Sequence, residues 1–159
     1  MTDLTFRLAT HDDLIDIVRM LTADPLGALR ENAALPLSAR YVTAFNRIQQ
    51  DENQELTVAE LNGEIVGTFQ LTFIQYLTHQ GGLRAQIEAV RAKSTHRGKG
   101  IGTAMFRYAI DRASQRGCYV LQLTTDKQRP KAIQFYEMLG FTATHEGMKL
   151  TLHPVTTEH

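Results

Sequence analysis

A glycine-rich turn that runs directly into a helix is the feature that most constrains the fold of this chain. Residues 93–106 read KSTHRGKGIGTAMF, with three glycines at alternate positions. A strand-like segment, 83–94, precedes the turn, and apolar residues at helical spacing follow it as far as Gln115. A helix N-terminus carries unpaired N–H groups and partial positive charge, and glycine lets an anion approach the backbone. The sequence therefore predicts a phosphate-binding turn between a strand and a helix.

The spacing of these glycines does not fit two common nucleotide-binding motifs. The dinucleotide fingerprint G-x-G-x-x-G needs a third glycine where this chain has Thr103. The P-loop needs a Lys-Ser or Lys-Thr pair, but Lys99 is followed by Gly100. A connection that merely turns the chain is a further interpretation, although Arg97 and Lys99 beside the glycines favour an anion site.

The rest of the chain alternates between predicted strands and helices. The strongest local signal is Asn62-Gly63, which predicts a tight hairpin turn between strands at 56–61 and 65–77. Further strands are expected at 4–9, 118–125 and, as a closing pair, within 141–152, and further helices at 14–23, 37–50 and 130–139. The order is β-α-α-β-β-β-α-β-α-β-β, which predicts one mixed α/β domain over residues 1–159.

Composition narrows the class of protein. With 43% hydrophobic residues, the 159-residue chain can bury one core. Its 17 basic and 17 acidic residues leave no overall field for nucleic acid or an anionic membrane. No apolar run is long enough for a membrane span, and the first residues lack a secretory pattern, which predicts a cytoplasmic protein. A single cysteine and scattered histidines predict neither a disulfide nor a structural metal.

The turn RGKGIG at 97–102 resembles the pyrophosphate-binding signature Q/R-x-x-G-x-G/A of the GCN5-related N-acetyltransferases (GNAT). The resemblance extends over 87–141 and includes AIQFYEMLGF at 132–141, which is similar to the family's closing A-x-x-F-Y-x-x-x-G-F pattern. It implies a GNAT-like α/β (α+β) fold, with a mixed, mostly antiparallel sheet that is splayed at the strand before the turn. It also implies acetyl-CoA as co-substrate, without a metal, and direct transfer of an acetyl group to a primary amine.

The resemblance also implies where the coenzyme binds. The backbone at Val90, Arg91 and Ala92, before the turn, would hydrogen-bond the pantetheine arm as an added strand would. The pyrophosphate would be held by the residues of the turn, namely Arg97, Gly98, Lys99, Gly100, Ile101, Gly102 and Thr103. For the Lys99 side chain, a solvated surface position is the alternative.

The pantetheine contact departs from the family pattern in one place. Many relatives have an asparagine six residues before the Phe of the F-Y pair, and this chain has Arg129 there. Asp126, three positions earlier, is the other candidate for this contact. Arg129 and Lys131 could instead reach the coenzyme phosphates, or could be solvated loop charges.

Two residues are candidates for catalysis. In the family, the tyrosine of the F-Y pair often lies beside the coenzyme sulfur, which makes Tyr136 the expected general acid; a core aromatic is its alternative role. Glu88 is a carboxylate in an otherwise apolar strand and matches the position of a general base in several relatives. The alternative for Glu88 is a structural ion pair with Arg84 or Arg91.

The acceptor amine is left open by the sequence, which allows a small molecule or a peptide. Segments 22–50 and 77–84 are expected to wall the acceptor side; with Tyr76, which directly precedes the second segment, they offer Arg30, Glu31, Arg40, Tyr41, His79 and Arg84. The alternative functions are a non-catalytic acyl-CoA-binding sensor and, against the charge balance, a nucleic-acid-binding module. The chain could also act as a homodimer.

Overall fold

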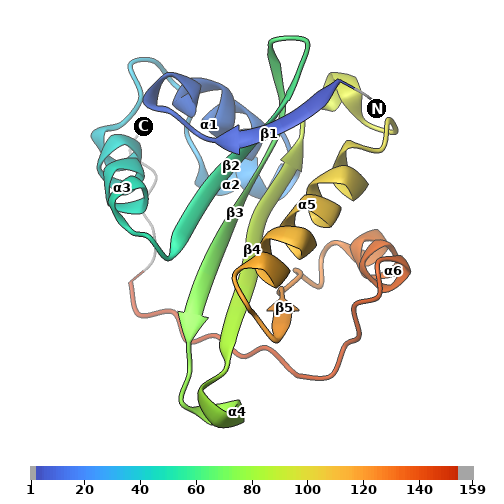
Figure 1. Ribbon diagram of the computed structural model, residues 1–159. Helices are drawn as coiled ribbons and strands as arrows, with labels where there is room; N and C mark the ends of the chain where they lie inside the picture. Colours follow the sequence, from blue (N-terminus) through green and yellow to red (C-terminus); the bar gives the residue numbers. More distant parts are fainter. Residues whose placement is uncertain (1–2, 154–159) are drawn as a thin grey trace.

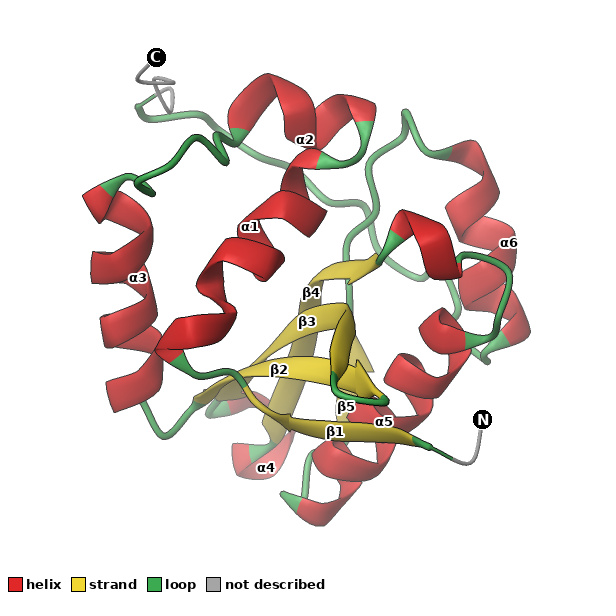
Figure 2. Ribbon diagram, turned by 90° about the horizontal axis from the view of Figure 1, so that it is seen from above, coloured by secondary structure: helices red, strands yellow, loops and turns green. Residues whose placement is uncertain are grey.

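The computed structural model describes residues 3–153 and contains a five-stranded sheet with helices on both faces (Figures 1 and 2). The strands, which lie in the order of the chain, are β1 (Leu4–Leu8), β2 (Gln54–Leu61), β3 (Glu64–Gln75), β4 (Leu83–Ala92) and β5 (Val120–Gln122). The pairs from β1 to β4 are antiparallel, and β5 is parallel to β4. The predicted mixed, mostly antiparallel sheet is therefore confirmed.

Helices α1 (Leu14–Thr22) and α3 (Ala39–Gln50) cover one face of the sheet, and α5 (Ile101–Gln115) and α6 (Pro130–Met138) cover the other (Figure 2). The shorter helical segments are η1 (His11–Asp13), α2 (Pro25–Arg30), α4 (Thr78–Gly81) and η2 (Ser94–His96). Helix α2 was not among the helices predicted from the sequence. A helix forms there because Asp24 caps it and Pro25 has a backbone suited to the first helical position.

The hydrophobic core consists of two clusters, one on each side of the sheet. The larger cluster packs α5 against β3 and β4, and includes Phe69, Leu71, Ile87, Met105 and Phe106, all at most 2% exposed. The smaller one packs α1 and α3 against β2. At the larger interface Gly67 allows the closest approach, because a Cβ atom there would lie 2.8 Å from the sulfur of Met105.

The predicted hairpin turn at Asn62-Gly63 joins β2 to β3, and both residues have positive φ values, 51° and 80°. The sequence predicted this turn correctly because its conformation depends only on two adjacent residues.

A bulge at Ala89 changes which way the side chains of β4 point. Ala89 has a φ of 53°, and the register between β3 and β4 shifts at this position. Ile87 packs in the α5 core before the bulge, and Val90 packs there after it. The intervening extra residue therefore places Glu88 and Arg91 on the same face of the sheet, the face that carries α1 and α2.

Strand β4 is paired with β5 along only part of its length. Arg84, Ala85 and Gln86 pair with Val120 to Gln122, and the described residues form no ladder beyond this point. The edge of β4 from Glu88 to Ala92 therefore lacks a neighbouring strand on the β5 side, which agrees with the expected splay. Strand β5 is also shorter than the predicted strand 118–125, because β5 diverges from β4 after Gln122.

The prediction of a closing pair of strands within 141–152 is wrong. The structure has no strand between Phe141 and His153, and the tail leaves α6 and crosses toward the side of α3, away from β5 (Figure 1). The alternating Met148, Leu150 and Leu152 are 93%, 85% and 77% exposed. Alternation favours a strand only where a sheet edge supplies hydrogen-bonding partners, and a two-stranded hairpin alone is marginal in water.

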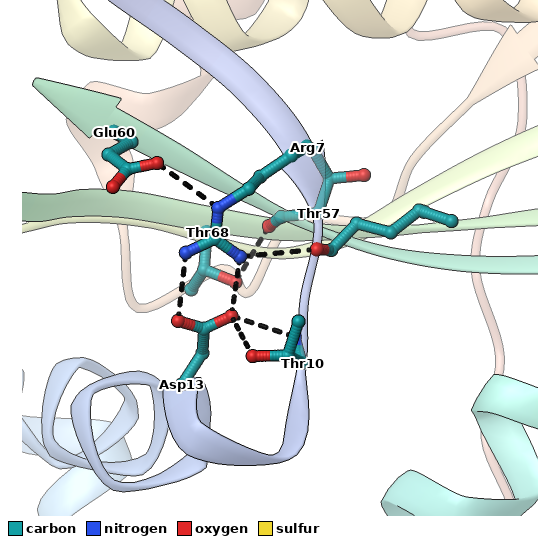
Figure 3. A network of polar contacts seen from close by, with 7 residues as sticks. Arg7, Thr10, Asp13, Thr57, Glu60 and Thr68 are labelled. Carbon is teal, nitrogen blue, oxygen red and sulfur yellow. Dashed lines mark hydrogen bonds and ion pairs between the residues drawn. The ribbon is translucent and has the colours of Figure 1, made fainter. Parts of the chain in front are cut away.

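A half-buried ion pair joins β1 to the start of α1 (Figure 3). The Arg7 guanidinium donates to both carboxylate oxygens of Asp13, at 2.7 and 3.0 Å, and its Nε donates to Glu60 at 3.1 Å. Asp13 also accepts from the backbone N–H of Thr10 at 2.7 Å. The hydrogen bond from Arg7 lowers the pKa of Asp13, which is only 6% exposed. This network fixes where α1 begins.

We expect Asp13→Asn to lower the free energy of unfolding at pH 7 by about 1.5 to 3 kcal/mol, the range for hydrogen bonds to charged groups. Because the pKa of Asp13 is lower in the folded state, its stabilisation is complete above the unfolded pKa and is lost as the pH falls through the folded pKa. Urea titrations between pH 7 and pH 2 should therefore show the gap between the two proteins closing at acid pH. Asp12→Asn, at an exposed neighbour, is the control. A gap that is independent of pH would contradict this assignment.

Candidate functional site

The glycine turn forms one wall of a hollow of about 320 Å³ at the N-terminus of α5. It is lined by Ala92, His96, Arg97, Gly98, Gly100, Ile101, Gly102, Thr103 and Phe135. Gly98 and Gly100 both have a φ of 78°, a conformation that glycine adopts without strain, and Gly100 is the N-cap of α5. The helix therefore starts at the hollow with its partial positive charge directed toward it.

The other residues of the turn differ in what they can offer a ligand. Ile101 is 2% exposed and belongs to the core, so its amide rather than its side chain is available. A Cβ atom on Gly102 would lie 3.6 Å from the ring of Phe135, an ordinary contact. The side chains of Arg97 and Lys99 are exposed at the rim, where they can add positive charge to an anion site.

Val90 and Ala92 lie on the unpaired part of β4, directly before the turn. Their side chains pack against the α5 core, so their backbone groups are what the open edge presents. The carbonyl of Val90 already accepts a hydrogen bond from Arg91 at 3.0 Å. An extended chain could pair with this edge as a further strand would.

Tyr136 lies within an aromatic cluster that joins α6 to α5. Its ring centroid is 5.6 Å from that of Phe106, 5.7 Å from Phe135 and 6.2 Å from Phe141. The side chain is half-buried and lies near Arg91 of β4. The cluster therefore holds the ring in place against α5.

Glu88 is exposed on β4 and accepts a hydrogen bond from the amide of Gln86. It forms no ion pair with either candidate partner. Arg84 instead lies over the ring of Tyr76, 4.3 Å from its centroid, and Arg91 faces Asp24. The ion-pair interpretation of Glu88 therefore finds no support, and its carboxylate is open to solvent and to a substrate.

Asp126 and Arg129 take part in contacts of the loop before α6. The carboxylate of Asp126 accepts from the backbone N–H of Gln128 at 2.9 Å, which closes a turn. Arg129 forms an ion pair with Asp24, the residue that caps α2 on the other side of the splay. Asp24 was not among the functional residues predicted from the sequence. The Asp-Pro pair could have indicated a helix cap, but nothing local indicated its arginine partners.

The residues expected to wall the acceptor side do not lie together. The loop 77–84, with α4, lies at the opposite end of β4 from the glycine turn (Figure 1). His79 stacks on Tyr119 there, with ring centroids 4.7 Å apart. The hydroxyl of Tyr41 lies near α2, where it donates to Glu31 at 3.0 Å, and burial raises its pKa. Only the segment 22–50 therefore approaches the splay.

Within residues 3–153, no group of three or more histidine, cysteine, aspartate or glutamate side chains could hold a metal ion. Across the same part of the chain, every helix is too short or too polar to cross a membrane.

Several proteins of known structure resemble this chain. A crystal structure described as a transcriptional regulator from Bacillus halodurans C-125 is 53% identical, with a TM-score of 0.91, and the match covers 94% of this chain and 99% of that one. An acetyltransferase structure from Trypanosoma brucei is 28% identical, with a TM-score of 0.75 and coverage of 94% and 100%.

Sequence relatives point to the same family. An uncharacterized N-acetyltransferase of Methanocaldococcus jannaschii is 28% identical over 86% of this chain and 60% of its own length. The glucosamine 6-phosphate N-acetyltransferase of Trypanosoma brucei brucei is 33% identical over 57% of this chain and 59% of its own. The chain thus spans about three fifths of the length of these relatives. Residues 21–141 match the Acetyltransferase (GNAT) family, and the chain belongs to this family.

Proposed function

We propose that this protein is an N-acetyltransferase that moves the acetyl group of acetyl-CoA directly to a primary amine. The observation that carries the proposal is the hollow at the N-terminus of α5, formed by two glycines with positive φ beside an unpaired strand edge. Amides at a helix N-terminus suit a pyrophosphate, and the open edge of β4 suits the amide-bearing pantetheine arm. The turn residues 97–103 and the backbone at Val90, Arg91 and Ala92 would hold the coenzyme.

In the proposed reaction the amine nitrogen attacks the thioester carbonyl, a carbon–nitrogen bond forms and the carbon–sulfur bond breaks. The exposed carboxylate of Glu88 takes the proton of the incoming ammonium, through water or directly. The phenol of Tyr136 gives a proton to the departing thiolate, and it is reprotonated, through water, by the proton that the nitrogen loses as the amide forms. The aromatic cluster supports this role, because it holds the ring against α5 and limits the orientations of the phenol.

The names of the relatives support an amine acceptor without specifying which one. They include acetyltransferases for glucosamine 6-phosphate, aminoalkylphosphonate and spermidine. All three substrates carry an amino group, and they differ in charge and size. The acetyl transfer is therefore the shared property, and the acceptor is a property of the individual protein.

The 53%-identical structure described as a transcriptional regulator favours a second candidate function, in which the coenzyme site serves regulation. Such a protein would bind acetyl-CoA and DNA but transfer no acetyl group. The exposed Arg97 and Lys99 would be its first candidates for contacts with phosphate. Salt-sensitive binding of a DNA duplex, with no release of thiol across an amine panel, would favour this function over catalysis.

The coenzyme site can be tested by thermal unfolding. At about one hundred times its dissociation constant, acetyl-CoA should stabilise the native protein by about 2.7 kcal/mol, which is several degrees in Tm. Gly100→Val should abolish this shift, because a branched side chain at φ 78° is strained and enters the path of the phosphates. Gly102→Ala is the matched control, since its Cβ has room beside Phe135. A native protein without a shift would refute the coenzyme assignment.

Tyr136→Phe tests the general acid because it removes one hydroxyl and keeps the ring. Steady-state thiol release at saturating acetyl-CoA should fall by about 10² to 10⁴, the usual contribution of a positioned acid. The Tm and the affinity for acetyl-CoA should be preserved, since the ring still fills its place in the cluster. Tyr108→Phe, in the core stack with Phe6, is the control. Turnover within about threefold of native, below that range, would remove Tyr136 from the mechanism.

Glu88→Gln tests the general base through the pH dependence of turnover. Fewer amines are neutral at low pH, so the loss in kcat should be largest there and should shrink as the pH approaches the pKa of the amine. Acetyl-CoA affinity should change little. Glu52→Gln, at an exposed carboxylate, is the control. A folded Glu88→Gln protein with the native pH profile would exclude this residue as the base.

A further inference from the structure

Two arginines from different elements converge on one carboxylate at the acceptor side of the splay. Arg129, at the start of α6, forms an ion pair with Oδ2 of Asp24, and the Nε of Arg91 on β4 lies 3.8 Å from Oδ1 of the same residue. Asp24 and Arg91 are each 16% exposed at the side chain, and Arg129 is 31% exposed. The group is therefore largely withdrawn from water but still reachable.

Both carboxylate oxygens of Asp24 already have partners other than Arg91. Its Oδ1 accepts from the backbone N–H of Gly27 at 3.0 Å, which caps α2, and its Oδ2 is taken by Arg129. At 3.8 Å the Nε of Arg91 is too far for a hydrogen bond, and this buried atom has no partner among the described residues. Burial lowers the pKa of Arg91, because it withdraws the charged form from water, and the like charges of Arg129 and Arg30 lower it further. A buried charged donor without an acceptor is costly.

The charges around this group leave an excess of positive charge. Arg30 also lies near Arg91, and the Nε of Arg30 lies 3.7 Å from Glu31. Among the described residues, the ion pairs of this group therefore match three guanidinium groups with two carboxylates, Asp24 and Glu31. One further negative charge would balance the group.

The position of the group relative to the proposed catalytic residues indicates what could supply that charge. Arg91 lies three positions after Glu88, and the bulge puts both on one face of β4. Tyr136 is one of the side chains near Arg91. The coenzyme pyrophosphate would lie elsewhere, at the turn 97–103 on the α5 side. The side chain of Arg91, unlike its backbone, therefore lies on the face left to the acceptor.

We propose that the acceptor amine carries an anionic group, a carboxylate or a phosphate, that is bound by Arg91 and Arg129. This inference rests on the proposed acetyl transfer. A guanidinium pairs with either anion through two parallel hydrogen bonds, and Arg91 has an unused donor for this purpose. The anion would bind at one end of the acceptor and leave the amine near Glu88.

The test compares amines that differ only in this anionic group. β-Alanine is paired with β-alaninamide, and 2-aminoethyl phosphate with 2-aminoethanol, so that the two pairs distinguish carboxylate from phosphate. Both kcat/KM with acetyl-CoA and the equilibrium affinity for the protein loaded with coenzyme A are measured. In at least one pair, the anionic member should be favoured by about 10- to 100-fold, the range for a hydrogen bond to a charged group.

Two variants test whether these arginines cause the preference. Arg91→Gln and Arg129→Gln should each reduce the ratio between the two members of the favoured pair toward one. The ratio is informative because a general loss of activity cancels from it. Arg47→Gln, at an exposed arginine of α3, is the matched control and should keep the native ratio. The Tm of each protein reports whether it is folded, and the two variants are independent of each other.

The binding measurement separates this inference from the proposed function. A protein that binds the anionic amine preferentially but transfers no acetyl group would refute the proposed function and support the anion site. Equal affinities and equal kcat/KM in both pairs, or an anion preference that survives both arginine variants, would overturn the inference.

Discussion

The short pairing between β4 and β5 is the constraint on which the proposed site depends. The two strands share hydrogen bonds over Arg84 to Gln86 alone and then diverge. Divergence leaves the β4 edge open from Glu88 to Ala92, and the same gap receives the N-terminus of α5 on one side and Asp24 on the other. If the ladder continued, backbone hydrogen bonds would fill the edge and the strand could not present it to a ligand. The incomplete sheet is thus what would allow the proposed coenzyme and acceptor to meet.

The parts of this structure that could be predicted from the sequence are those whose causes are local. The Asn62-Gly63 turn and the glycines before α5 depend on backbone conformations that few residues adopt, so their identity carries the information. The contacts of Asp24 with Arg91 and Arg129 depend on three elements that meet only in the folded chain. No spacing in the sequence reports such a contact.

The closing segment 141–152 was mispredicted for the opposite reason. Its sequence alternates as a strand does, but no strand of the described chain pairs with it. Met148, Leu150 and Leu152 alternate as strand residues do, yet they are exposed.

The net charge of the chain likewise gave no information about the charge at individual sites. The chain has equal numbers of basic and acidic residues. Arg7 is nevertheless compensated by Asp13 and Glu60, while the arginines around Asp24 exceed their carboxylates. Equal numbers of basic and acidic residues in the whole chain therefore say little about the charge at any one site.

The bulge at Ala89 determines which face of the sheet each side chain of β4 points to. Upstream of it, residues with even numbers point to the face that carries α1 and α2, and downstream of it residues with odd numbers do. Deleting Ala89 would restore regular alternation and leave Val90 and Arg91 on their present faces. An insertion or deletion in the regular part of β4 would instead move every residue beyond it to the opposite face in one step, whereas a substitution changes one side chain at a time.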